Sequence, residues 1–203
     1  MKVLIQNLQK REGLATSLSQ KHDPDVMLLQ EINLNSETHP FPANNVSSMG
    51  YGTAIGSSKF KLSNIRGVKS PYTEFGGFIR KKTTVATVNG IQFISFHGYN
   101  GQPFKNVAKL VAHVDAVLAE LEPGPAIFAG DFNTWSAEHL SAVQGSLEKF
   151  DFRLTYSWQY PGRDQPLDHA FTRGVKISTS ENYSCESDHR GAIREIDLGG
   201  SEL

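Results

Sequence analysis

The stretch AIFAGDFN, residues Ala126–Asn133, decides the fold class of this 203-residue chain. Its four apolar residues predict a short buried strand, and Gly130 permits a tight turn or a close backbone approach directly after it. Asp131 and Asn133 are two residues apart in that turn, so both side chains can face the same side. A buried strand that ends in polar residues is how an α/β scaffold builds a site from distant parts of the chain.

The same arrangement recurs elsewhere in the chain. The other stretches are VLIQN (Val3–Asn7), VMLLQE (Val26–Glu31), IQFISFH (Ile91–His97), PLDHAF (Pro166–Phe171) and SDH (Ser187–His189). Together they supply carboxylate, amide and imidazole groups without a pair of cysteines, which suits a hard divalent cation and a phosphate. We therefore expect one cleft in which Glu31 lies close to Asp131 and His189.

Composition limits the function classes. An apolar content of 38% and a charged content of 20% are typical of a soluble globule, and we expect one domain over residues 1–203. The formal charge of -1 means that nucleic-acid binding would need a local basic patch. The single cysteine, Cys185, excludes an internal disulfide framework and a cysteine-based zinc site, and we expect it to fill space in a strand. We see no membrane-spanning run and no signal peptide, so we expect a cytoplasmic protein, without a predicted protein partner.

The patterns predict one mixed α/β domain. Asn89-Gly90 is a strong hairpin signal between two strands, and apolar residues at three- and four-residue steps predict an amphipathic helix from Pro103 to Leu121. Ser136 is a candidate cap for another helix, and we expect a loop over Asn33–Ser48. The remaining expected elements are a helix at Glu12–Gln20 and strands at Val3–Ile5, Val26–Leu29, Tyr51–Ile55, Phe60–Val68, Phe75–Val88, Ile91–Phe96, Ala126–Ala129, Arg153–Trp158, His169–Thr172, Val175–Thr179 and Gly191–Ile196.

Each candidate taken alone has a structural explanation. Glu31 is equally suited to capping a helix or pairing with an arginine, and the Asp131–Asn133 turn can be an Asx-turn without chemistry. A lone histidine such as His97 is more often structural than catalytic. We expect that structural role for His169, because it should alternate away from Asp168 along a strand. The other histidines, which we place on the surface or in helices, are His22, His39, His113 and His139.

The motifs QE at Gln30-Glu31, GDFN at Gly130–Asn133 and SDH at Ser187–His189, in this order, resemble those of the endonuclease/exonuclease/phosphatase superfamily. That superfamily includes pancreatic-type deoxyribonucleases, abasic-site endonucleases, neutral sphingomyelinases and inositol polyphosphate 5-phosphatases. The match runs over nearly the whole chain. Ala129–Ser136 (AGDFNTWS) and Pro166–Gly174 (PLDHAFTRG) are most similar to a compact bacterial branch.

The resemblance implies a DNase-I-like α/β (α+β) fold: a four-layer sandwich of two mixed β-sheets packed face to face, with helices on the outside. It also implies Mg²⁺ or Mn²⁺ as cofactor and a role for each site residue. Glu31 would hold the metal, with Asn7 and Asp188 close by. Asp131 would orient the attacking water, Asn133 and His97 would bind the phosphate, and His189, supported by Asp168, would stabilise charge or act as base.

The implied activity is metal-dependent hydrolysis of a phosphate ester, and we favour a phosphodiesterase or nuclease. The alternatives are a phosphomonoesterase, a phospholipase C-like enzyme, or a non-catalytic module that binds phosphorylated ligands. Seven basic residues between Lys59 and Lys82 are candidates for a nucleic-acid groove, although a solvated face is the commoner role, and Trp135 and Trp158 are candidates for base stacking. The segment from Glu31 to His97 is short, without recognisable substrate-gripping insertions or a membrane-docking hairpin.

Overall fold

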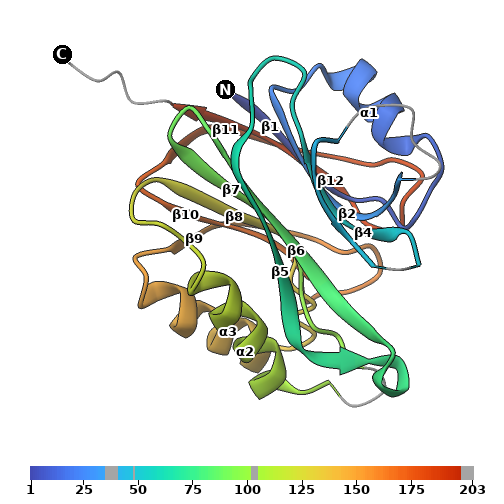
Figure 1. Cartoon of the computed structure of the whole chain (residues 1–203), viewed down its shortest axis with the longest axis vertical. Coiled ribbons are helices and arrows are strands. Elements are labelled where there is room, and N and C mark those ends of the chain that lie inside the picture. The colour runs from blue at the N-terminus through green and yellow to red at the C-terminus, as the bar shows by residue number, and fades with distance from the viewer. Residues whose placement is uncertain (35–40, 48, 102–104, 198–203) are drawn as a thin grey trace.

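A computed structural model of the chain describes residues 1–34, 41–47, 49–101 and 105–197. Two six-stranded sheets form its centre, and Figure 1 shows helices on both outer sides. The first sheet has the order β11 (Lys176–Tyr183), β12 (Gly191–Asp197), β1 (Lys2–Asn7), β2 (Val26–Asn33), β4 (Tyr51–Gly56), β3 (Ala43–Val46). The second has the order β5 (Ser63–Glu74), β6 (Ile79–Val88), β7 (Ile91–His97), β8 (Ala126–Asp131), β10 (Asp168–Arg173), β9 (Arg153–Trp158).

In the described part of the chain, three α-helices cover the outer faces. Helix α1 (Leu14–His22) packs on the first sheet, and helices α2 (Val107–Leu118) and α3 (Ala137–Glu148) pack on the second (Figure 1). The four-layer fold with two mixed sheets is therefore confirmed. Within the described residues, no helix has the length and apolarity needed to cross a bilayer.

The continuous apolar runs of the central strands follow from burial on both faces. In β8, Ile127 and Ala129 enter the core between the sheets, whereas Phe128 packs under α2 and α3. In β1, Val3 and Ile5 face the core between the sheets and Leu4 faces α1. Successive side chains of a strand point to opposite faces, so a strand covered on both sides needs apolar residues at every position.

Two parallel pairs set the position of the site. Strands β1 and β2 are parallel with Asn7 opposite Gln30, and β7 and β8 are parallel with His97 opposite Asp131. Each pair is joined by a helix, as parallel strands require. The carboxyl ends of these four strands carry the polar residues that follow the apolar runs, so the sheets deliver them to one edge of the sandwich.

Several local predictions are confirmed. Val88 pairs with Ile91 across Asn89 and Gly90, whose φ values of 48° and 77° form the two-residue turn of a hairpin. The Ser136 hydroxyl accepts from the His139 N–H at the start of α3.

Other boundaries were wrong. The expected loop Asn33–Ser48 contains β3, whose sequence ANNV lacks the β-branched pattern of a strand. The expected strand Phe75–Val88 begins only at Ile79, because Gly76 and Gly77 adopt positive φ in a short 3₁₀ turn. Strand β5 extends through Pro71 to Glu74, which an edge strand tolerates. The start expected at Pro103 for helix α2 lies outside the described residues, and the helix ends at Leu118 rather than Leu121.

Candidate active site

Asp131 lies at the centre of the site because of its strand register. It ends β8, with His97 opposite it on the parallel strand β7 and Asp168 opposite it on the antiparallel strand β10. The preceding Gly130 has φ 136°, and a Cβ there would clash with the backbone oxygen of Phe96. Glycine is therefore required for the close approach of β8 and β7 directly before the carboxylate.

The two oxygens of Asp131 have different partners. Oδ1 accepts a hydrogen bond of 2.9 Å from the N–H of Asn133, so the Asx-turn is present. Oδ2 accepts from Asn7 Nδ2 at 3.1 Å and lies 3.6 Å from His97 Nε2 and 3.7 Å from His189 Nε2. One oxygen thus fixes the turn while the other faces the converging polar groups.

His189 is held by a buried carboxylate. Its Nδ1 lies 2.8 Å from Asp168 Oδ2, and the ring of Tyr160 packs edge-on against the imidazole with centroids 4.7 Å apart. Burial disfavours the charge, but Asp168 and then Asp131 outweigh it and raise the pKa of His189 to about 10. His189 is therefore an imidazolium at neutral pH, with Nε2 directed toward Asp131.

His97 has the opposite charge state. Burial, followed by the neighbouring Lys81 ammonium, holds its pKa well below the usual value of 6.5. Its Nε2 lies 2.5 Å from Lys81 Nζ, as expected for a neutral imidazole that accepts from the ammonium. The contacts of 3.6 Å that this nitrogen makes with Glu31 and Asp131 are accordingly not ion pairs. Lys81 supplies the positive charge in this corner.

Glu31 occupies a β-bulge. The pairing of β2 with β4 passes from Gln30 opposite Thr53 to Ile32 opposite Gly52, so Glu31 is the extra residue. Its φ is 51°, a conformation that costs a non-glycine residue about 1 kcal/mol or more. Bulges re-aim side chains beside active sites, and here Glu31 Oε1 lies 3.6 Å from His97 Nε2 while Oε2 lies 3.9 Å from Lys10 Nζ.

The remaining candidates take different positions. Asn7 is buried behind Asp131, and its Oδ1 accepts from the N–H of Gln9. Asp188 is exposed at the rim, where its Oδ2 accepts from the Tyr160 hydroxyl at 2.9 Å. Asn133 is 3% exposed and donates from Nδ2 to the carbonyl oxygen of Gly98 at 3.0 Å.

One cavity of about 250 Å³ joins these groups. Its lining includes Glu31, His97, Asp131, Asn133, Asp188 and His189, and also Lys10, Tyr51, Glu74, Lys81, Asn100, Trp135, Tyr160 and Leu167. Glu31 thus lies in the same cleft as Asp131 and His189. Asn7 and Asp168 support this cavity from behind. Sequence reasoning missed Glu74, Tyr160 and Lys10 altogether, because no local pattern distinguishes them from surface residues.

The donor set decides which metal the site can hold. Among the described residues, no three His, Cys, Asp or Glu side chains converge as a metal cage. Glu31 presents one carboxylate to a polar cavity, with Asp131 nearby, since both lie 3.6 Å from the same nitrogen of His97. Mg²⁺ typically binds through one or two carboxylates and keeps several waters. An open, oxygen-rich set of this kind fits Mg²⁺ and does not fit a closed zinc site.

The basic residues between Lys59 and Lys82 do not form one groove. Lys59 pairs with Asp23 and Asp25, and Arg66 pairs with Glu122. Lys81 enters the cavity, which corrects its expected place on a solvated face. Lys69, Arg80 and Lys82 line a separate hollow beside the exposed Phe78 and Met49.

Trp158 is 2% exposed and donates to the carbonyl oxygen of Arg190, so it cannot stack on a base. Trp135 does line the cavity.

The other histidines for which the structure gives contacts are structural. His169 lies between the hydroxyls of Thr134 and Ser157 at 2.6 and 2.7 Å, and burial lowers its pKa to about 3. His113 is fully buried in α2 against Phe96, and burial likewise lowers its pKa to about 3. His139 packs at the start of α3, and His39 lies outside the described residues.

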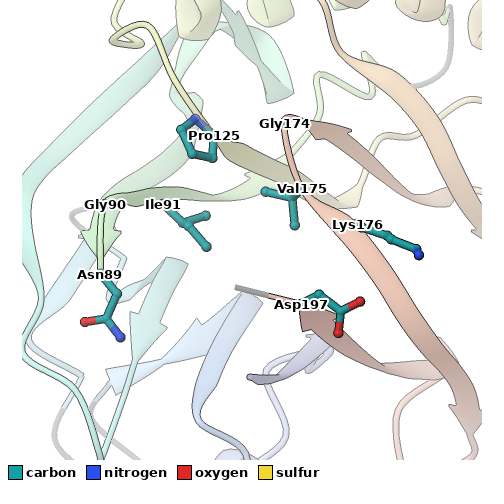
Figure 2. A pocket seen from close by; sticks show the side chains of 8 residues that line it. All are labelled: Asn89, Gly90, Ile91, Pro125, Gly174, Val175, Lys176 and Asp197. Carbon is teal, nitrogen blue, oxygen red and sulfur yellow. The ribbon is translucent and has the colours of Figure 1, made fainter. Parts of the chain in front are cut away.

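A larger cavity, about 730 Å³, lies at the opposite ends of β7 and β8. Figure 2 shows Ile91 and Val175 among its lining side chains, with the Asn89-Gly90 turn at one side and Pro125 at another. Its charged lining residues are Lys176 and Asp197. Without convergent polar groups it does not have the character of a catalytic site.

Comparison with known proteins agrees with the motif resemblance. The chain is 40% identical over 92 residues to a UPF0294 protein of Vibrio campbellii, and the match covers 42% of this chain and 32% of that relative. The chain thus spans about a third of the length of the curated relative.

Two solved structures share the fold. The 3′ phosphatase NExo from Neisseria, bound to a product DNA hairpin, has a TM-score of 0.70 at 18% identity, with coverage of 97% of this chain and 99% of that one. A mannosyl-6-phosphatase of Bacteroides thetaiotaomicron has a TM-score of 0.68 at 13% identity, with coverage of 98% and 100%. The profile of the endonuclease/exonuclease/phosphatase family matches residues 6–189, and this chain therefore belongs to that family.

Proposed function

We propose that this protein is a divalent-metal-dependent phosphoesterase that cleaves phosphodiesters, with its reaction centre at Asp131 Oδ2. The observation that carries the proposal is the convergence on this oxygen of His97 Nε2 at 3.6 Å and His189 Nε2 at 3.7 Å, in a cavity that Glu31 also lines. Membership of a family of phosphoester hydrolases supports the reaction class.

In this proposal Asp131 orients the nucleophile. A water held by Oδ2 attacks phosphorus, and its proton passes toward the carboxylate. The bond from phosphorus to the leaving oxygen breaks, and the leaving oxygen departs with the bonding electron pair as an alkoxide. Asn7 and the N–H of Asn133 fix the carboxylate through their hydrogen bonds, so its orientation is set before substrate binds.

Positive charge for the phosphoryl oxygens comes from three sources. The imidazolium of His189, fixed by Asp168, and the ammonium of Lys81, in contact with His97, are both present in the cavity. Mg²⁺ or Mn²⁺, held chiefly by Glu31 with Asp188 at the rim, would neutralise the phosphoryl charge when bound. The second N–H of the Asn133 amide remains to donate to a phosphoryl oxygen.

The test is a screen of DNA, RNA, nucleotides, inositol phosphates and phospholipids with added Mg²⁺ or Mn²⁺. Asp131→Ala and His189→Ala are the controls. We expect each variant to lose activity by about 10²–10³ or more while retaining a wild-type circular dichroism spectrum. Near-wild-type turnover by either folded variant would refute the assignment.

Substrate class has a separate readout in the same screen. Cleavage of DNA or RNA that falls steeply with salt would identify a nuclease. Activity restricted to small soluble phosphomonoesters would replace the phosphodiester proposal with a phosphatase.

A further inference from the structure

A pair of cations lies on the indole of Trp135 at the wall of the cavity. Lys105 Nζ lies 2.8 Å from the ring centroid and Arg163 Cζ lies 4.1 Å from it. Asn100 Oδ1 accepts from Trp135 Nε1 at 2.8 Å and from Lys105 Nζ at 3.3 Å. The ring thus contacts both cationic groups, and the amide oxygen holds Lys105 against it.

Neither charge has a carboxylate within ion-pair distance in the described part of the chain. The ion pairs found there involve other residues, and neither Lys105 nor Arg163 pairs with a carboxylate. Burial, and then the positive charge of Arg163, lower the pKa of Lys105 to about 8. The protein thus holds two like charges together at an energetic cost, which a bound anion would offset.

The two residues that contact the pair, Trp135 and Asn100, line the same cavity as Asp131. Trp135 follows the turn that carries Asp131 and Asn133, and it lines the cavity together with Asn100 and Tyr160. The negative charge of Asp131 favours the charged form of Lys105 and partly opposes the lowering of its pKa. Because the cations lie over the indole ring, Trp135 acts as a platform for them rather than as a surface for base stacking.

We propose that Lys105 and Arg163, ordered on Trp135 and Asn100, bind a second phosphoryl group of the substrate beside the one cleaved at Asp131. The proposal rests on the phosphoesterase function given above and deepens it. The substrates would carry two phosphoryl groups, either as successive links of an oligonucleotide or as a small bisphosphate. Arginine binds phosphate in a bidentate manner and lysine as a point charge, so the pair suits a phosphoryl group.

The experiment measures binding in the Asp131→Asn protein with Mg²⁺, so that ligands survive. One pair of ligands is adenosine 5′-monophosphate and adenosine 3′,5′-bisphosphate, and the other is a thymidine dinucleotide and trinucleotide with one and two internal phosphates. Calorimetry gives the affinities. Tryptophan fluorescence reports the site, because Trp135 and the buried Trp158 are the two tryptophans.

In at least one of the two ligand pairs, we expect the ligand with two phosphates to bind about tenfold more tightly than the ligand with one phosphate. The Lys105→Met/Arg163→Gln double substitution should remove this advantage and leave binding of the single-phosphate ligand within about twofold. The matched control is the Lys149→Met/Arg153→Gln double substitution. It removes two exposed cations, one directly after α3 and one at the first residue of β9. It should keep the advantage.

Tighter binding of the two-phosphate ligand in both pairs supports a site for any second phosphate. Tighter binding of the trinucleotide alone supports an oligonucleotide substrate. Equal affinities in both pairs, or an advantage that survives the Lys105/Arg163 double substitution, would overturn the subsite. Because binding is measured without turnover, failure of the wild-type protein to hydrolyse any ester would count against the phosphoesterase function and not against this anion site.

Discussion

Asp168 and His189 form a buried pair, with 2.8 Å between Asp168 Oδ2 and His189 Nδ1. Asp168 begins β10, next to Asp131 on β8, whereas His189 precedes β12 in the other sheet. The pair therefore links the two sheets at the edge where the cavity opens. Because Nδ1 is engaged, the imidazole presents only Nε2 to Asp131, at 3.7 Å.

Asp168→Asn should reduce kcat while leaving KM within a few-fold. The amide preserves the shape of the side chain but removes the negative charge that orients and stabilises the imidazolium, so we expect a loss of about 10²–10³ in kcat. Steady-state kinetics on the best substrate of the screen gives both constants. Asp151→Asn, on the exposed turn before β9, is the matched control and should be silent. A purely structural role for Asp168 would instead lower the fraction of active protein without changing kcat per active site.

Glu31→Gly should stabilise the fold while weakening metal binding. Glycine adopts the positive φ of the bulge without strain, which is worth about 0.5–1.5 kcal/mol in the free energy of unfolding. The substitution also separates no buried ion pair, since Glu31 contacts a neutral imidazole and a half-exposed lysine.

Urea denaturation without metal measures the stability of Glu31→Gly, and Mn²⁺ titration measures its affinity for metal. We expect the affinity to fall by on the order of tenfold or more, with Glu12→Gly on the exposed segment before α1 as control. Unchanged Mn²⁺ binding would remove Glu31 from the metal site.

Gly130→Ala and Gly145→Ala should shift stability in opposite directions. At Gly130 the added methyl would meet the Phe96 carbonyl oxygen in a backbone conformation that alanine avoids, and we expect a loss of several kcal/mol, on the order of 3 or more. At Gly145, inside α3, a Cβ meets nothing within 4 Å, and we expect a gain of about 0.5–1 kcal/mol. Thermal melts of the two variants provide the comparison. If Gly130→Ala were neutral, the close approach of β7 and β8 would not be a constraint.

His113→Gln should make the protein less sensitive to acid. Burial holds the pKa of His113 at about 3 in the folded chain, against about 6.5 when unfolded. The stability that depends on its neutral form is complete above pH 6.5 and is lost as the pH falls toward 3, by up to about 1.4 kcal/mol per pH unit.

Urea titrations at pH 7 and pH 5 test this linkage. The decrease in unfolding free energy between the two pH values should be about 2 kcal/mol smaller in His113→Gln than in wild type. His169→Gln should give a similar reduction, because the same burial lowers its pKa. An identical decrease in wild type and both variants would mean that these imidazoles have the same pKa in the folded protein as in the unfolded chain.

Local patterns were enough to identify the framework. Uninterrupted apolar runs such as that before Asp131 indicate strands covered on both faces, and the Asn89-Gly90 pair fixes its hairpin because both residues accept positive φ. The polar residues at the ends of these runs predicted one shared cleft, since the carboxyl ends of parallel strands meet at one edge. The four-residue strand β3 escaped detection because its pairing with β4, rather than its own sequence ANNV, makes it a strand.

The sequence by itself determined one mixed α/β domain whose buried strands end in polar residues, because periodicity and turn chemistry are local properties, whereas the arrangement in two packed sheets followed only from the family resemblance. Only the tertiary structure decided their charge states and neighbours. His97 ends β7 and His189 precedes β12; burial beside Lys81 keeps His97 neutral, whereas Asp168 and Asp131 keep His189 charged. Lys81, Lys105 and Arg163 likewise acquire their places only through packing, because the energy of a charge depends on its distances to groups far away in the chain.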